Sequence, residues 1–169
     1  GHDARFGRGN TGDLDTMREL GAEMGFEVVA VEDLDALPEG PGDTSGRRCS
    51  STWIREALAA GDVRTAARLL GRTHRMRGTV VHGAARGREL GFPTANLAPE
   101  STGLIPADGI YAGWLVDSAG TRWPAAISVG SNPTFDGVSR QVEAHVIDRP
   151  QEAVEDFDLY GQCVGVEFV

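Results

Sequence analysis

The residues best suited to chemistry lie between positions 83 and 97, where the chain reads GAARGRELGFPTANL. Three glycines in this segment allow the backbone to turn sharply and to approach a ligand closely. Arg86 and Arg88 offer planar, permanently charged donors that suit phosphate oxygens. The segment therefore predicts a phosphate-binding loop.

Two possible metal ligands follow at once, because Thr94 and Asn96 come directly after the stiffening Pro93. Alternate residues of an extended segment point to the same side, so a hydroxyl and a carboxamide oxygen can face one ligand. Both are hard oxygen donors that suit a Mg²⁺ ion which also binds water and nucleotide phosphate. The residues alone leave a second interpretation open, in which the glycines and Pro93 form a turn, the arginines are solvated and Asn96 bonds the backbone.

A second candidate anion site lies in the segment SSTWIREAL, where Ser51 and Thr52 are expected at the start of a helix. Their hydroxyls, the free N–H groups and the positive end of the helix dipole favour an anion, and Arg55 follows one turn later. The alternative is that Ser51 only caps the helix and Arg55 lies on a solvated face.

Composition excludes several function classes. The chain has 169 residues, a formal net charge of −9 and 16 basic residues, all of them arginine. The absence of lysine excludes a lysine-dependent P-loop, a Schiff base and a lysine general base. A pI near 4.8 argues against a nucleic-acid partner, and no apolar run has membrane-spanning length. Cys49 and Cys163 show no CxxC spacing, which favours a reduced, cytoplasmic setting.

The first half of the chain has the pattern of an α/β fold. Residues 13–24 are expected to form a helix that Asp13 caps and Gly25 ends. The apolar run 26–31 predicts a buried strand. Two further helices are expected, over 52–60 with Ser51 as the cap and over 63–70 with Asp62 as the cap and Gly71 as the stop.

From about Met76 the hydrophobic period changes to two, which predicts a small antiparallel barrel or sandwich. In the run VEAHVI, Val142 and Ala144 share one face, and Glu143 and His145 share the other. We expect a domain boundary near His74. The expected strands cover residues 78–81, 110–116, 123–129, 141–147 and 162–169.

The segment GRELGFPTAN resembles the signature of the riboflavin kinase family. Further segments match that family in chain order, namely PADGIYAGW, PAAISVGSNPTF, VEAHVID and DLYGQCVGVEF. The resemblance implies a six-stranded antiparallel Greek-key β-barrel over residues 75–169. It also implies transfer of the ATP γ-phosphoryl group to the 5′-hydroxyl of riboflavin, which gives FMN.

The same resemblance implies site residues. Thr94 and Asn96 would hold the divalent metal, Mg²⁺ or another ion, that bridges the nucleotide phosphates. Glu143 would accept the proton of the ribityl hydroxyl, although a solvated strand residue is the commoner fate of a glutamate. A flavin-side loop would carry Asn132, Thr134 and Phe135, the last of which could equally be a core aromatic. The ATP loop would contain Gly83, Ala84, Arg86 and Arg88 beside the metal ligands.

The front half resembles the nucleotidyltransferase module of bacterial bifunctional FAD synthetases, through GHDARFGRGNTGD and SSTWIREAL. Residues 1–74 are therefore expected to be the C-terminal part of a Rossmann-like FMN adenylyltransferase domain, in which Ser51, Thr52 and Arg55 meet ATP phosphates. The HxGH motif of that module is absent, so we expect this chain alone not to make FAD. The helix that the kinase family adds after its last strand is also expected to be missing, as in a piece of a longer protein.

A different class of function remains open from the sequence. The barrel could bind flavin or nucleotide without catalysing transfer, or it could be a structural barrel that shares only ancestry with the kinases. Binding of riboflavin without formation of FMN would identify the first of these alternatives.

Overall fold

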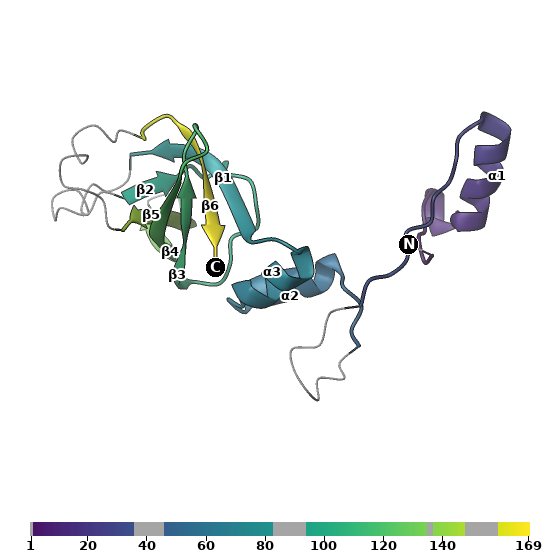
Figure 1. Cartoon of the computed structure of the whole chain (residues 1–169), viewed down its shortest axis with the longest axis horizontal. Coiled ribbons are helices and arrows are strands. Elements are labelled where there is room, and N and C mark those ends of the chain that lie inside the picture. Colours follow the sequence, from purple (N-terminus) through teal and green to yellow (C-terminus); the bar gives the residue numbers. More distant parts are fainter. Residues whose placement is uncertain (1, 36–45, 83–93, 135–136, 148–158) are drawn as a thin grey trace. The chain divides into compact units, whose positions relative to one another are not determined.

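The computed structural model describes residues 2–35, 46–82, 94–134, 137–147 and 159–169. The chain forms two compact units, Gly1–Cys49 and Ser50–Val169, each of which is treated by itself (Figure 1). Both cysteines are free. In the part of the chain that the structure describes, no helix is long and apolar enough to span a membrane.

The first unit contains a short 3-10 helix, Arg8–Asn10, and helix α1, Leu14–Met24. The Asp13 side chain accepts a hydrogen bond from the Thr16 backbone N–H at 3.0 Å and so caps α1. Gly25 ends the helix in the left-handed conformation, with φ of 78°. The helix and both of its end residues confirm the sequence prediction.

The buried strand predicted over residues 26–31 is wrong. This segment forms no strand, and Phe26, Val29 and Val31 are exposed. An extended segment becomes a stable strand only when its backbone groups pair with a neighbour. The described residues of this unit offer only the isolated bridges Phe6–Gly12 and Asp35–Arg48, neither of which reaches the segment. Residues 2–35 and 46–74, the described part of this half, therefore show no Rossmann-like arrangement.

The second unit opens with helices α2, Ser51–Ala59, and α3, Val63–Leu70. Asp62 caps α3 through the Thr65 N–H at 2.9 Å, and Gly71 ends it in the left-handed conformation, as predicted. The predicted cap of α2 is wrong by one residue. Ser50, not Ser51, has the extended backbone of a cap, and its hydroxyl accepts from the Trp53 N–H at 3.2 Å.

Both helices belong to the same compact unit as the sheet. Leu58 and Ala66 lie in the common hydrophobic core, and the Ala107 N–H donates to the Leu58 carbonyl at 2.8 Å. The compact unit therefore begins at Ser50, upstream of the boundary expected near His74. A division of the chain into two family modules at residue 74 stays a prediction.

The remaining residues form a closed barrel of six antiparallel strands in the order β1-β2-β5-β4-β3-β6 (Figure 1). Strands β3, β4 and β5 form a meander, and β6 returns beside β3, which is a Greek-key arrangement. Of the barrel and the sandwich that the period-two pattern allowed, the barrel is observed, and the six-stranded Greek-key barrel that the resemblance implied is confirmed. The strands are β1 His74–Val81, β2 Thr94–Leu97, β3 Gly109–Val116, β4 Arg122–Thr134, β5 Gly137–Val146 and β6 Cys163–Phe168.

Strands β1, β4 and β5 are longer than the pattern predicted, β3 and β6 differ from their predicted bounds by one residue at one end or at both, and β2 was not among the predicted strands. Strand β1 begins at His74 because β6 pairs with it over its whole first part, from His74–Phe168 to Thr79–Cys163. Arginines on its exposed face obscure the apolar alternation there. Strands β4 and β5 extend to the Thr134–Gly137 pair because they form one long hairpin. The short strand β2 has no apolar run of its own.

The barrel interior is apolar, as alternation along each strand requires. The interior side chains are small or branched, with Phe168 the largest, and no residue of the first unit belongs to the described core. The buried barrel residues are Met76, Val80, Ala95, Leu97, Leu115, Ala125, Ile127, Val129, Val142, Ala144, Val164, Val166 and Phe168.

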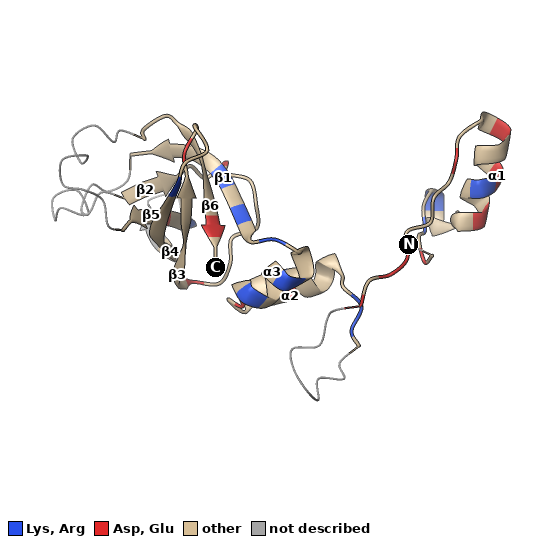
Figure 2. Cartoon of the chain, in the orientation of Figure 1, with Lys and Arg blue, Asp and Glu red and all other residues tan. Residues whose placement is uncertain are grey.

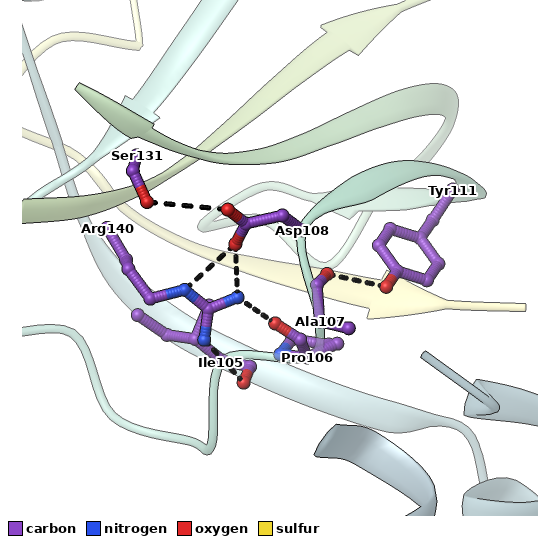
Figure 3. A network of polar contacts seen from close by, with 7 residues as sticks. All are labelled: Ile105, Pro106, Ala107, Asp108, Tyr111, Ser131 and Arg140. Atoms are coloured by element: carbon purple, nitrogen blue, oxygen red, sulfur yellow. Dashed lines mark hydrogen bonds and ion pairs between the residues drawn. The ribbon is translucent and has the colours of Figure 1, made fainter. Parts of the chain in front are cut away.

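Arg140 holds one end of β5 to the segment that precedes β3 (Figure 3). Its guanidinium donates to Asp108 Oδ1 through Nε at 3.0 Å and Nη2 at 2.6 Å, and to the Pro106 carbonyl. Ser131, opposite Arg140 on β4, donates to Asp108 Oδ2 at 3.3 Å. Ala107, which lies between Pro106 and Asp108, donates its N–H to the Leu58 carbonyl of α2. The segment 105–108 therefore contacts both the α2–α3 pair of helices and the β4–β5 hairpin.

Candidate active site

Three polar side chains form a row across the outer face of the barrel. The strand register places Asn96 of β2 opposite Glu143 of β5, and Glu143 opposite Ser128 of β4. Directly opposed residues of antiparallel strands have Cβ atoms about 4.5–5.5 Å apart, so these side chains are neighbours. Their chain neighbours Ala95, Ala144 and Ile127 are buried in the interior, which confirms that the row faces outward.

Thr94 and Asn96 lie together as the sequence predicted. The Asn96 Nδ2 group lies 3.3 Å from Thr94 Oγ1 and 3.4 Å from the Thr94 carbonyl oxygen. Both side chains are half-buried. In both contacts the amide N–H of Asn96 is the donor, so this carboxamide bonds the Thr94 hydroxyl and backbone carbonyl. The roles of Thr94 Oγ1 and Asn96 Oδ1 as cation ligands stay predictions.

Acidic residues do not complete this pair into a metal centre. In the described ranges, no group of three or more His, Cys, Asp or Glu side chains could hold a metal ion. Two neutral ligands bind a divalent cation weakly unless further oxygens, such as those of a nucleotide phosphate, take part.

Glu143 is half-buried between Asn96 and Ser128. Among the residues that the structure describes, its carboxylate has no hydrogen-bond or ion-pair partner, in contrast to the paired carboxylates of Asp108 and Glu167. A rigid strand carries it, and both neighbouring strands fix that strand's register. A carboxylate held in this way is available to a substrate hydroxyl.

Sequence reasoning missed two features near this row. Ser128 lies in the segment PAAISVGSNPTF but was not singled out as a site residue, and only the register of β4 against β5 brings it to Glu143. The rings of His82 and Tyr160 stack with centroids 3.8 Å apart, just beyond the pair between Val81 and Asn96. Local sequence holds no signal for this stack, because the two residues are far apart in the chain and meet only through the bridge of Tyr160 to Val80.

Several expected site residues are not placed. Gly83, Ala84, Arg86, Arg88 and Phe135 lie outside the described residues.

The flavin-side loop is corrected in part. The backbones of Asn132 and Thr134 belong to β4, paired with Ser139 and Gly137, because the β4–β5 hairpin continues to its tip. The roles proposed for the side chains of Asn132 and Thr134 stay predictions.

Ser51, Thr52 and Arg55 lie in the first two turns of α2 with exposed side chains. Ser50 already takes the Trp53 N–H, so the hydroxyls of Ser51 and Thr52 are not used as the cap. This arrangement is open to an anion, and it equally allows three solvated side chains.

A family model and several curated relatives match this chain, and their descriptions all name riboflavin kinase. A family model described as Flavokinase: Riboflavin kinase matches residues 70–169. The bifunctional riboflavin kinase/FMN adenylyltransferase of Escherichia coli K12 is 36% identical over 166 residues, which cover 98% of this chain and 48% of the relative. The enzymes of that name from Pseudomonas fluorescens and Bacillus subtilis are 38% and 31% identical, over 88% and 99% of this chain and 45% and 49% of the relative.

A solved structure also resembles the chain. The crystal structure described as a macrolide-efflux protein from Streptococcus pneumoniae has a TM-score of 0.73 and 34% identity, over 99% of this chain and 49% of that one. The chain spans about half the length of the curated relatives that it matches.

Proposed function

The chain belongs to the riboflavin kinase family, and from this premise we propose that its barrel transfers the γ-phosphoryl group of ATP to the 5′-hydroxyl of riboflavin. The observation that carries the proposal is the pairing of Asn96 with Glu143 on one outer face, beside Thr94. That row combines two oxygen ligands for a cation with a carboxylate that has no other described partner.

Glu143 is the proposed general base. Its carboxylate accepts the proton of the ribityl 5′-hydroxyl while that oxygen forms a bond to the γ-phosphorus. The bond between the γ-phosphorus and the β–γ bridging oxygen breaks, and ADP leaves with the bonding electrons. Because phosphoryl transfer depends mainly on positioning, a base on a strand held on both sides suits the reaction.

Thr94 and Asn96 are the proposed ligands of Mg²⁺ or another divalent cation. A bound cation would neutralise phosphate charge and orient the nucleotide. The chain carries a net charge of −9, so a cation between this protein and ATP also reduces their repulsion. The loop residues Gly83, Ala84, Arg86 and Arg88 are proposed to complete the contacts to ATP.

For the front half we propose descent from an FMN adenylyltransferase module, with Ser51, Thr52 and Arg55 as its phosphate-binding remnant. Exposure of all three at the start of α2 supports this assignment. We expect no FAD from this chain with FMN and ATP. We further propose a cytoplasmic setting and small-molecule substrates, without a nucleic-acid or membrane partner.

The decisive assay follows FMN formation from riboflavin and Mg-ATP. Glu143→Gln keeps the shape of the side chain and removes the base, so we expect kcat to fall by about 100-fold or more. Asn96→Ala removes a cation ligand, so we expect mainly a higher KM for Mg-ATP and a greater demand for Mg²⁺.

Glu100→Gln is the matched control, because it makes the same chemical change at an exposed glutamate outside the row. Its kcat should equal that of the unchanged chain. Unaltered FMN formation in both Glu143→Gln and Asn96→Ala would refute the assigned roles. If riboflavin fluorescence is quenched but no FMN forms, the barrel is a non-catalytic flavin-binding module and not a kinase.

A further inference from the structure

A pocket of about 360 Å³ lies on the barrel wall apart from the Asn96–Glu143 row. It is lined by Arg72, Thr73, Arg75, Arg77, Thr102 and Gly103. Arg77 and Val81 both lie on the exposed face of β1, four residues apart, which at 3.3 Å per residue is about 13 Å. Since Val81 is the residue that pairs with Asn96, the pocket is separate from the proposed kinase site.

Positive charge is concentrated here in a chain that is acidic as a whole. In Figure 2 the arginines, drawn in blue, lie along β1 and in the segment just before it. Arg75 pairs with Glu167, but that carboxylate is shared with Arg122. Arg77 Nε contacts only the Cys163 sulfur at 3.4 Å, and Arg72 Nη1 donates to the Thr73 carbonyl at 3.1 Å. Within the described ranges neither Arg72 nor Arg77 has a carboxylate partner.

The walls of the pocket are held in place before any ligand arrives. Backbone hydrogen bonds join Arg77 and Thr102 in both directions, at 3.0 and 2.8 Å, and so fix the segment after β2 against β1. Gly103 has φ of 104°, and a Cβ there would lie 2.8 Å from the Arg75 carbonyl oxygen. Only glycine therefore allows this close approach. Arg75 is held by a glutamate that is 3% exposed.

We propose that this pocket binds a multiply charged phosphate anion, such as a diphosphate group. Guanidinium groups present planar forks of donors that match phosphate oxygens, and three of them line one pocket. The hydroxyl group of Thr73 can add a neutral donor, whereas the Thr102 hydroxyl donates to the Arg77 carbonyl at 3.2 Å. Free inorganic pyrophosphate and the diphosphate group of a nucleotide share this chemistry, so the experiment compares the two.

Isothermal titration of the whole 169-residue chain with inorganic pyrophosphate tests the proposal. The titration contains EDTA, which removes the divalent cations on which the Thr94–Asn96 pair depends. We expect saturable binding that weakens as the salt concentration rises. In the double variant Arg72→Gln/Arg77→Gln, which leaves the Arg75–Glu167 pair intact, the affinity should fall by at least about tenfold. Its melting temperature should not change, because neither arginine loses a carboxylate partner.

Arg64→Gln is the matched control, since Arg64 is exposed on α3 and does not line the pocket. Its affinity for pyrophosphate should equal that of the unchanged chain. Titration with ADP distinguishes a nucleotide ligand from free pyrophosphate. If ADP binds more tightly than pyrophosphate, the ligand is a nucleotide; if ADP binds equally or more weakly, the ligand is the free anion. No heat of binding at millimolar pyrophosphate, or equal affinity in the double variant, would overturn the proposal. FMN formation by the double variant should be unchanged, which separates this site from the kinase site.

Discussion

At the scale of single residues, Glu167 shows how one buried carboxylate can join three strands. It lies on β6, and its side chain accepts from Arg75 of β1 and, at 2.7 Å, from Arg122 at the start of β4. Arg122 also lies over the Trp114 ring of β3, 4.7 Å from its centroid. Burial tends to raise the pKa of Glu167, but the hydrogen bonds and charges of Arg75 and Arg122 outweigh it and hold the pKa below its ordinary value of 4.5.

The lowered pKa of Glu167 decides how the stability of the barrel changes with pH. Because folding lowers the pKa of Glu167, its ion pairs stabilise the barrel above about pH 4.5, and this contribution is lost as the pH falls through the folded-state pKa. We expect Glu167→Gln to lower the free energy of unfolding at pH 7 by about 1–3 kcal/mol. The difference from the unchanged chain should shrink below pH 4.5.

Urea unfolding at pH 7 and at pH 3.5 measures both effects. Glu100→Gln again serves as the control, since an exposed glutamate should alter neither value by more than about 0.5 kcal/mol. A stability difference for Glu167→Gln that stays constant from pH 7 to pH 3.5 would contradict the role of ionised Glu167.

At the scale of elements, the closure of β3 against β6 depends on an absent side chain. Gly113 lies opposite Phe168, and a Cβ at this position would overlap the Glu167 carbonyl oxygen and the Ile127 Cδ1 atom. The two strands can approach each other only because position 113 has no Cβ. The same closure places Glu167 opposite Trp114, over whose ring Arg122 lies.

Gly113→Ala should therefore force the strands apart and cost about 2–3 kcal/mol of unfolding free energy. Gly130→Ala on β4 is the matched control, because no atom lies within 4 Å of a Cβ built there. That variant should be neutral or stabilising by up to about 1 kcal/mol. Equal unfolding midpoints for the two variants in urea would contradict this account of the β3–β6 contact.

At the scale of the whole molecule, the described core belongs to the second unit. Every residue of the hydrophobic cluster lies between Ala57 and Phe168, and none comes from Gly1–Cys49. Helices α2 and α3 supply part of that cluster, so a boundary at residue 74 would expose Leu58 and Ala66. The independently stable piece should therefore start at Ser50.

We expect a chain of residues 50–169 to unfold cooperatively, with a melting temperature within a few degrees of that of the whole chain. A chain of residues 75–169 should be less stable, because it loses the buried surface of both helices. Thermal unfolding followed by circular dichroism compares the three chains. A non-cooperative transition for 50–169, or equal stability of 75–169, would show that the unit boundary is misplaced.

Much of this molecule was predictable because the signals are local. Asp13 and Asp62 cap their helices through side chains three residues from their partners, and Gly25 and Gly71 end them through their own backbone freedom. The alternation around Glu143 predicted its outward face. The exposure of Phe26, Val29 and Val31 was not predictable, because whether an apolar run pairs as a strand depends on partners elsewhere in the chain.

The sequence by itself determined which chemical groups are available: a hydroxyl at Thr94, a carboxamide at Asn96, a carboxylate at Glu143, and arginine as the only strong cation. Only the tertiary structure decided which of these groups meet. Asn96 reaches Glu143 through the register of β2 against β5, and Arg75 reaches Glu167 through β1 against β6. Register depends on which faces the barrel buries, a property of all six strands together, so no single segment encodes it.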